Sequence, residues 1–177
     1  NISFSYGGSE RKIFSNLSCT IAAGERIAVI GENGVGKTTL LKLLMNEVQP
    51  QFGEIRWAEK AKPGYYSQDH SDLFKSETSL TDWIAEFVRA GGYEGGDVET
   101  LIRGTLGRLL FSGDEVKKPV NVISGGEQGR MLFGKLMLLH SNVLIMDEPT
   151  NHLDMESIES LNTGLEKFPG TLVFISH

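Results

Sequence analysis

The segment from Gly31 to Thr38, GENGVGKT, constrains the fold of this 177-residue chain more than any other part of its sequence. It matches the pattern G-x-x-x-x-G-K-[ST], in which glycines allow backbone N–H groups to turn inward around a polyphosphate. The apolar run at 27–30 predicts a buried strand that enters this loop, and residues 38–45 predict a helix that leaves it. A strand, a phosphate loop and a helix in this order predict an α/β domain of the P-loop NTPase class.

The side chains of the loop extend this prediction to a metal ion. Lys37 can reach the β- and γ-phosphates of a nucleoside triphosphate, and the Thr38 hydroxyl can ligate Mg²⁺. The predicted nucleotide contacts of the loop are Gly31, Asn33, Gly34, Gly36, Lys37, Thr38 and Thr39. A glycine-rich turn without a ligand is the alternative, but the flanking strand and helix patterns argue against it.

The segment 142–148, NVLIMDE, predicts the second half of the same site. Its four consecutive apolar residues indicate a parallel strand that is buried on both faces. Ligands bind at the carboxyl ends of such strands, which is where Asp147 and Glu148 stand. Asp147 suits the Mg²⁺ shell, directly or through water, and Glu148 suits a general base that polarises an attacking water. Without the phosphate loop, an acidic pair in a surface turn would be the simpler interpretation.

The segment 124–127, SGGE, has two interpretations. Ser124 with Glu127 three residues later predicts a capping box at the start of an apolar-faced helix, 128–140. The exposed N-terminus of a helix that begins with Gly125 and Gly126 is also suited to bind an anion. Spacing alone does not decide between a structural helix start and an anion site.

Composition limits the remaining classes of function. A net charge of −6 argues against a broad nucleic-acid-binding face on this segment. No apolar run approaches the length of a membrane span, and the first residues lack the basic region of a signal peptide. Cys19 is the only cysteine, which excludes an internal disulfide and favours a reducing, cytoplasmic compartment. The chain has no initiator Met and stops after a strand-like run, so we expect it to be an excerpt of a longer protein.

Hydrophobic periodicity divides the chain into a nucleotide-binding core and a helical insertion. Strands are expected at 2–6, 17–21, 54–57, 143–146 and 172–175, and helices at 80–89, 98–110, 128–140 and 155–166. We therefore expect a single domain over 1–177, in which 1–68 and 141–177 form the α/β core and 69–140 form a helical subdomain.

Together these motifs resemble an ATP-binding-cassette (ABC) ATPase domain over essentially the whole chain. ISGGEQ at 123–128 resembles the signature motif of that superfamily. Gln68 resembles its Q-loop glutamine, His177 resembles its switch histidine, and Tyr6 stands where the family places an aromatic residue that stacks on adenine. For Tyr6, simple packing near a strand end is the alternative. The resemblance implies ATP as the nucleotide and an ABC-type fold, with a mixed-sheet core and a helical subdomain.

EPTNHLD at 148–154 is similar to the hallmark of the ABC-F family, whose members carry two cassettes on one chain. Residues 107–111, 117–119 and 129–135 resemble the second, C-terminal cassette of its YbiT-like branch. The resemblance implies a second ABC domain as partner, supplied by the same chain in the intact protein. It also implies contacts with the ribosome and tRNA through regions outside this segment.

The same resemblance implies a role for each site residue. Glu148, Gln68 and His177 would act in catalysis, and Thr38, Gln68 and Asp147 would hold Mg²⁺. The signature residues Ser124, Gly125, Gly126 and Glu127 would act in trans on ATP held by the partner cassette, while Asp154 of the D-loop would lie at the interface between cassettes.

Two other ABC classes are the alternatives. The ATPase subunit of a membrane transporter shares most of these motifs, but its D-loop more often has a Ser-Ala-Leu-Asp-like sequence. A DNA-repair or chromosome-structural ATPase usually separates its phosphate loop from its acidic motif by long coiled coils, and the interval between Lys37 and Asp147 is too short for them.

Overall fold

The computed structural model describes residues 2–6, 12–93, 97–151 and 153–176. Its residues group into two compact units. The sheet unit comprises Asn1–Tyr65, Asn142–Pro149 and Pro169–His177, and the helical unit comprises Tyr66–Ser141 and Thr150–Phe168. Residues 150–168 thus group with the helices, whereas the sequence placed all of 141–177 in the α/β core.

The sheet unit contains a four-stranded sheet in the order β3-β6-β5-β4. The strands are β3 (Arg26–Val29), β6 (Thr171–Ile175), β5 (Val143–Asp147) and β4 (Pro63–Tyr66). β6 pairs in parallel with both β3 and β5, and every residue of β5 is buried. The prediction of a parallel strand buried on both faces is therefore confirmed for 143–147.

Antiparallel pairing lies in a separate sheet. β1 (Ile2–Phe4) pairs antiparallel with β2 (Phe14–Leu17), and the register shifts within the pair. The expected mixture of parallel and antiparallel strands is thus present, but it is divided between two sheets among the described residues.

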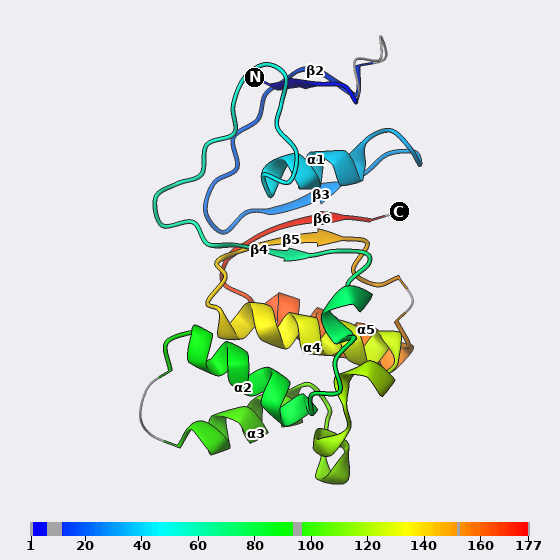
Figure 1. The fold of residues 1–177 in the computed structure, drawn as a ribbon. Helices are drawn as coiled ribbons and strands as arrows, with labels where there is room; N and C mark the ends of the chain where they lie inside the picture. The colour runs from blue at the N-terminus through cyan, green and yellow to red at the C-terminus, as the bar shows by residue number, and fades with distance from the viewer. Residues whose placement is uncertain (1, 7–11, 94–96, 152, 177) are drawn as a thin grey trace. The chain divides into compact units, whose positions relative to one another are not determined.

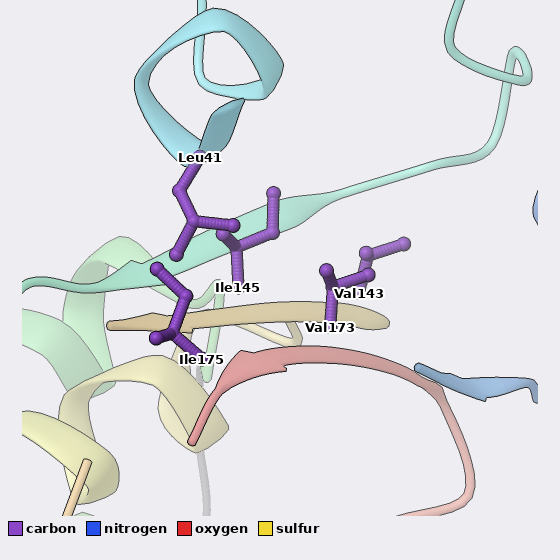
Figure 2. Packing of buried hydrophobic residues seen from close by; sticks show 5 residues of the cluster. All are labelled: Leu41, Val143, Ile145, Val173 and Ile175. Atoms are coloured by element: carbon purple, nitrogen blue, oxygen red, sulfur yellow. The ribbon is translucent and has the colours of Figure 1, made fainter. Parts of the chain in front are cut away.

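Helix α1 (Lys37–Leu44) packs on both of these layers through alternate leucines. Leu41 joins a buried cluster with Val143 and Ile145 of β5 and with Val173 and Ile175 of β6. Figure 2 shows the Leu41 side chain reaching from α1 towards the sheet residues. Leu43, two positions on, joins a second cluster with residues of β1. The helix that follows the phosphate loop is therefore fixed from two directions.

The helical unit is built around α4 (Gly125–Leu138), which packs against α2 (Leu80–Ala90) and α5 (Met155–Lys167) (Figure 1). α3 (Val98–Arg108) packs against α2. Short 3₁₀ turns lie at Ser71–Phe74, Gly113–Lys117 and Val120–Val122. The long helices match their predicted positions to within a few residues at each end. No helix in the described part of the chain has the length and apolarity needed to cross a membrane.

Two strand predictions are wrong. Residues 54–57 form no strand: Glu54 and Arg56 make an exposed ion pair with each other, and the Trp57 indole N–H donates to the Leu44 carbonyl at 3.2 Å. The segment pairs with no strand among the described residues. The predicted strand 17–21 shares only Leu17 with β2, because the pairing with β1 falls earlier in the sequence.

Candidate functional site

The phosphate loop adopts backbone angles that favour glycine. Gly34 has φ +76° and Gly36 has φ +110°, in a region that residues with a Cβ rarely enter. A Cβ on Gly36 would also lie 2.4 Å from Cγ2 of Ile13. Gly36 directly precedes α1, so its angles aim the N-terminus of that helix into the loop, where backbone N–H groups bind anions.

Lys37 lies against its own loop. Its side chain is buried, and Nζ donates hydrogen bonds to the carbonyl oxygens of Gly31 at 2.7 Å and Glu32 at 3.0 Å. The ammonium therefore bridges the two ends of the phosphate loop. A cation held at this place is suited to meet the phosphates of a nucleotide.

Asp147 and Thr38 meet at the carboxyl end of β5. Asp147 is 1% exposed, and burial raises the pKa of its carboxyl. A hydrogen bond with the Thr38 hydroxyl opposes this shift, Glu148 adds to it, and Lys42 and Lys37 oppose it. The carboxylate oxygen Oδ1 is buried without a hydrogen-bond partner among the described residues. A hydroxyl and an unsatisfied carboxylate oxygen are hard oxygen ligands, so this pair fits Mg²⁺.

Glu148 has a left-handed backbone with φ +48°. For a residue with a Cβ this conformation costs about 1–2 kcal/mol, and such strain clusters at functional sites. The side chain is partly buried, directly after the last residue of β5. Nothing in the sequence pattern indicated this backbone geometry.

Tyr6 lies beside the N-terminal part of α1. Its ring packs edge-on against Phe4 with centroids 4.9 Å apart, and its hydroxyl lies 3.3 Å from the Thr39 hydroxyl. The side chain is 49% exposed, so the ring is accessible to a ligand as well as packed. Both interpretations of Tyr6 therefore stay compatible with its surroundings.

The predicted capping box at Ser124 is confirmed. The Ser124 hydroxyl accepts from the Glu127 N–H at 3.3 Å, and the Glu127 carboxylate accepts from the Ser124 N–H at 2.7 Å. Ser124 and Gly125 are exposed, whereas Gly126 is buried. A Cβ on Gly126 would lie 2.9 Å from the Ser157 Oγ and 3.4 Å from Oδ2 of Asp154, so the start of α4 contacts the start of α5.

Asp154 is the N-cap of α5. Its side chain accepts a hydrogen bond from the Ser157 N–H at 2.8 Å, and hydrogen bonds from Ser157 lower the pKa of its carboxyl. Capping is a structural role that the sequence analysis did not assign to this residue. Its position at an interface between cassettes stays a prediction.

Two site predictions remain, Gln68 and His177. Gln68 is exposed in a tight turn, where the Ser67 hydroxyl donates to the Asp69 carbonyl at 2.8 Å and the Ser71 N–H donates to the Asp69 carboxylate at 3.1 Å. His177 lies outside the described residues. The structure thus gathers the phosphate loop, Asp147 and Glu148 in the sheet unit, and the signature residues with Asp154 and Gln68 in the helical unit.

Residues 14–151 match the sequence model of the family described as ABC transporter. The chain belongs to that family. It is 54% identical over 165 residues to the ATP-binding protein YbiT of Escherichia coli O157:H7, a match that covers 93% of this chain and 30% of YbiT. It is 40% identical to ATP-binding cassette sub-family F member 3 of Mus musculus, over 97% of this chain and 23% of the mouse protein. The chain thus spans under a third of the length of these relatives.

The ABC fold is confirmed by a solved structure. A chain of a metal-chelate type ABC transporter in an inward-facing conformation superposes with a TM-score of 0.78 at 25% sequence identity, covering all of this chain and 71% of that one. With the sub-family F relatives, the family match identifies an ABC-F ATP-binding domain of the ATPase class. ABC domains bind ATP, generally with Mg²⁺, and pair with a second ABC domain. That this is the C-terminal cassette stays a prediction.

Proposed function

We propose that this ABC domain hydrolyses ATP at a site completed by a second ABC domain, and that the intact protein couples this cycle to the ribosome. The observation that carries the first part is the convergence of Lys37, Thr38 and Asp147 in one unit. Lys37 closes the phosphate loop on itself, and the Thr38 hydroxyl meets a buried carboxylate with an unsatisfied oxygen. This arrangement supplies a cation for phosphates and oxygen ligands for a divalent metal.

The reaction is ATP plus water to ADP plus inorganic phosphate. Lys37 and the N–H groups of the loop bind the phosphate oxygens, while Thr38, Asp147 and Gln68 would hold Mg²⁺. When bound, the metal would supply positive charge that offsets the negative charge of the phosphates. The remaining chemistry is assigned to Glu148, which orients the attacking water and accepts its proton, and to His177, which contacts the γ-phosphate. Tyr6 is assigned to stacking on the adenine.

The signature residues are assigned to a partner's nucleotide. Ser124 and Gly125 are exposed at the N-terminus of α4, where a helix presents free N–H groups and a positive dipole. Ser124 and Gly126 would contact the γ-phosphate of ATP held by the second cassette, with Glu127 fixing the cap and Asp154 at the contact between cassettes. ATP would then join two cassettes, and its hydrolysis would release them.

Coupling to the ribosome rests on the EPTNHLD segment at 148–154, which resembles the ABC-F hallmark, and on the sub-family F relatives. The net charge of −6 favours contacts through other parts of the intact protein rather than through this domain. We assign the protein to the cytoplasm because its single cysteine, Cys19, fits a reducing compartment.

The experiment that tests this proposal uses the intact parent protein with Glu148→Gln and its counterpart in the other cassette. We expect the locked protein to co-sediment with ribosomes when ATP is present and not when ADP is present. Deleting the other cassette and the linker should abolish co-sedimentation while nucleotide binding by this domain persists. Locked protein that fractionates with membranes and a permease would overturn the ribosome proposal.

That outcome would favour a second candidate, the ATPase subunit of a membrane transporter. The observation behind it is the structural likeness to a transporter chain, which covers the whole of this domain. The D-loop sequence favours the first candidate.

A further inference from the structure

Arg130, in the second turn of α4, has no part in the ATP hydrolysis reaction described above. One terminal nitrogen of its guanidinium donates to the Ser157 hydroxyl at 3.1 Å. The guanidinium carbon lies 5.1 Å from the centre of the Phe111 ring, within the range of a cation–π contact. The Nε atom is buried without a hydrogen-bond partner among the described residues. The side chain is thus held in one orientation, with its charged end directed at the first turn of α5.

Ser157 connects this arginine to the D-loop. The residue is fully buried, and its backbone N–H donates to the Asp154 carboxylate at 2.8 Å. Its hydroxyl lies so close to Gly126 that a Cβ there would sit 2.9 Å away. One serine therefore contacts the signature glycine, the D-loop aspartate and Arg130.

The start of α4 lies close to the segment 153–157 at Gly129 as well. A Cβ on Gly129 would lie 2.4 Å from the Tyr66 hydroxyl and 3.1 Å from Cδ2 of Leu153, the residue before Asp154. Gly126 and Gly129 thus bring α4 close to the segment 153–157, and Arg130 adds a directed, charged hydrogen bond across the same contact. Hydrogen bonds from a charged donor are shorter and stronger than neutral ones.

We propose that Arg130, through Ser157, is a positioning residue that fixes the signature residues of α4 relative to Asp154 of the same cassette. The proposal rests on the shared ATP site proposed above, because both groups it aligns would face the partner cassette. Catalysis by oriented groups loses rate steeply when their placement shifts by an ångström. Arg130 would touch neither ATP nor the attacking water.

The test uses the intact parent protein and steady-state ATP hydrolysis. Arg130→Met keeps an apolar stem and removes the charged guanidinium. Ser157→Ala removes the hydroxyl that accepts from Arg130 and hydrogen-bonds to Asp154, while its backbone N–H still caps α5. Arg103→Met is the matched control, because Arg103 on α3 is highly exposed and pairs with Glu99 on the surface at 2.6 Å. Binding of a fluorescent ATP analogue and the melting temperature are measured for each variant.

We expect Arg130→Met and Ser157→Ala each to lower kcat about tenfold with KM for ATP within about twofold of wild type. The double variant should lose no more than the larger of the two single losses, because Arg130 acts on Asp154 through Ser157. Arg130→Lys, which keeps a charged donor, should recover part of kcat, and Arg103→Met should match wild type.

Three results would overturn the proposal. They are a wild-type kcat for Arg130→Met, losses that multiply in the double variant, and a fall in kcat that only mirrors a fall in the fraction of folded, nucleotide-binding protein. Failure of the shared site itself would show differently. Wild-type protein would then hydrolyse ATP without its second cassette, whatever stands at position 130.

Discussion

The Thr38 hydroxyl hydrogen-bonds to the carboxylate of Asp147, which joins the start of α1 to the end of β5. The carboxylate is almost completely buried, and its Oδ1 has no hydrogen-bond partner among the described residues. Burying a carboxylate with incomplete hydrogen bonding is unfavourable unless a cation completes its surroundings. The domain therefore holds a negative charge in place for a metal at a cost to its own stability.

We expect Asp147→Asn to raise the melting temperature in Mg²⁺-free buffer at neutral pH by about 2–4 °C, since it removes a buried charge. The same variant should lose the additional stabilisation that Mg²⁺ gives in the presence of ATP. Differential scanning fluorimetry with and without Mg²⁺ measures both effects. Asp114→Asn, at a highly exposed carboxylate, is the control and should change neither. A lower melting temperature for Asp147→Asn in Mg²⁺-free buffer would contradict this account.

The buried Asp147 carboxyl should also make the stability of the domain depend on pH. Burial raises the pKa of Asp147 in the folded state, so this carboxyl binds a proton more tightly when folded than when unfolded. The contribution of Asp147 to stability therefore falls as the pH rises from about 4, the ordinary pKa of this carboxyl, through its raised pKa in the folded state. Chemical denaturation of wild type and Asp147→Asn across this range should show the variant gaining relative stability as pH rises. A constant difference would contradict the raised pKa.

We expect Glu148→Gln to bind ATP but to hydrolyse it at least about a hundredfold more slowly, because the amide cannot accept a proton from water. Release of inorganic phosphate by the intact protein measures the rate, and ATP should trap the two cassettes together. Phosphate release at the wild-type rate would remove Glu148 from the chemistry.

Lys37→Ala should weaken ATP binding by about tenfold or more, because it removes the cation that the phosphate loop holds against its carbonyls. Direct titration with a fluorescent ATP analogue gives the affinity. Lys75→Ala, at an exposed lysine paired with Asp72, is the control and should leave the affinity unchanged. An unchanged affinity for Lys37→Ala would count against its role.

Two glycines should respond oppositely to the same change. Gly36→Ala places a methyl group 2.4 Å from Ile13 at φ +110°, so we expect a loss of more than about 1 kcal/mol in stability together with weaker nucleotide binding. Gly104→Ala lies inside α3 with open space around the new methyl group, and should stabilise the protein by about 0.5–1 kcal/mol. Urea denaturation compares the two, and equal effects would contradict the conformational role of Gly36.

The sequence predicted those parts of the fold that depend on local pattern. The continuous apolar run at 143–146 favours a strand buried on both faces, and the Ser124 and Glu127 pair marks the start of α4. The false strand at 54–57 arose because a short alternating pattern does not reveal whether a partner strand exists. Only the tertiary structure decides that.

Contacts between distant segments were beyond the reach of the sequence. The left-handed backbone of Glu148 leaves no mark in residue type, since glutamate has no preference for it. An arginine in an apolar-faced helix does not indicate which residue it meets, so the contact between Arg130 and Ser157 required coordinates. Grouping of 150–168 with the helices follows from the packing of α5 on α4, which periodicity does not encode.

The alternate leucines of α1 have a consequence for how a nucleotide enters. Because Leu41 and Leu43 pack α1 against two different sheets, we expect the glycine-containing loop before the helix, rather than the helix itself, to adjust when a phosphate binds. The antiparallel strands β1 and β2 can then influence the nucleotide site through α1. Larger or smaller side chains at Ile2 and Phe4, which pack against Leu43, would tilt α1. This tilt would change the affinity for nucleotide without altering a residue that contacts it.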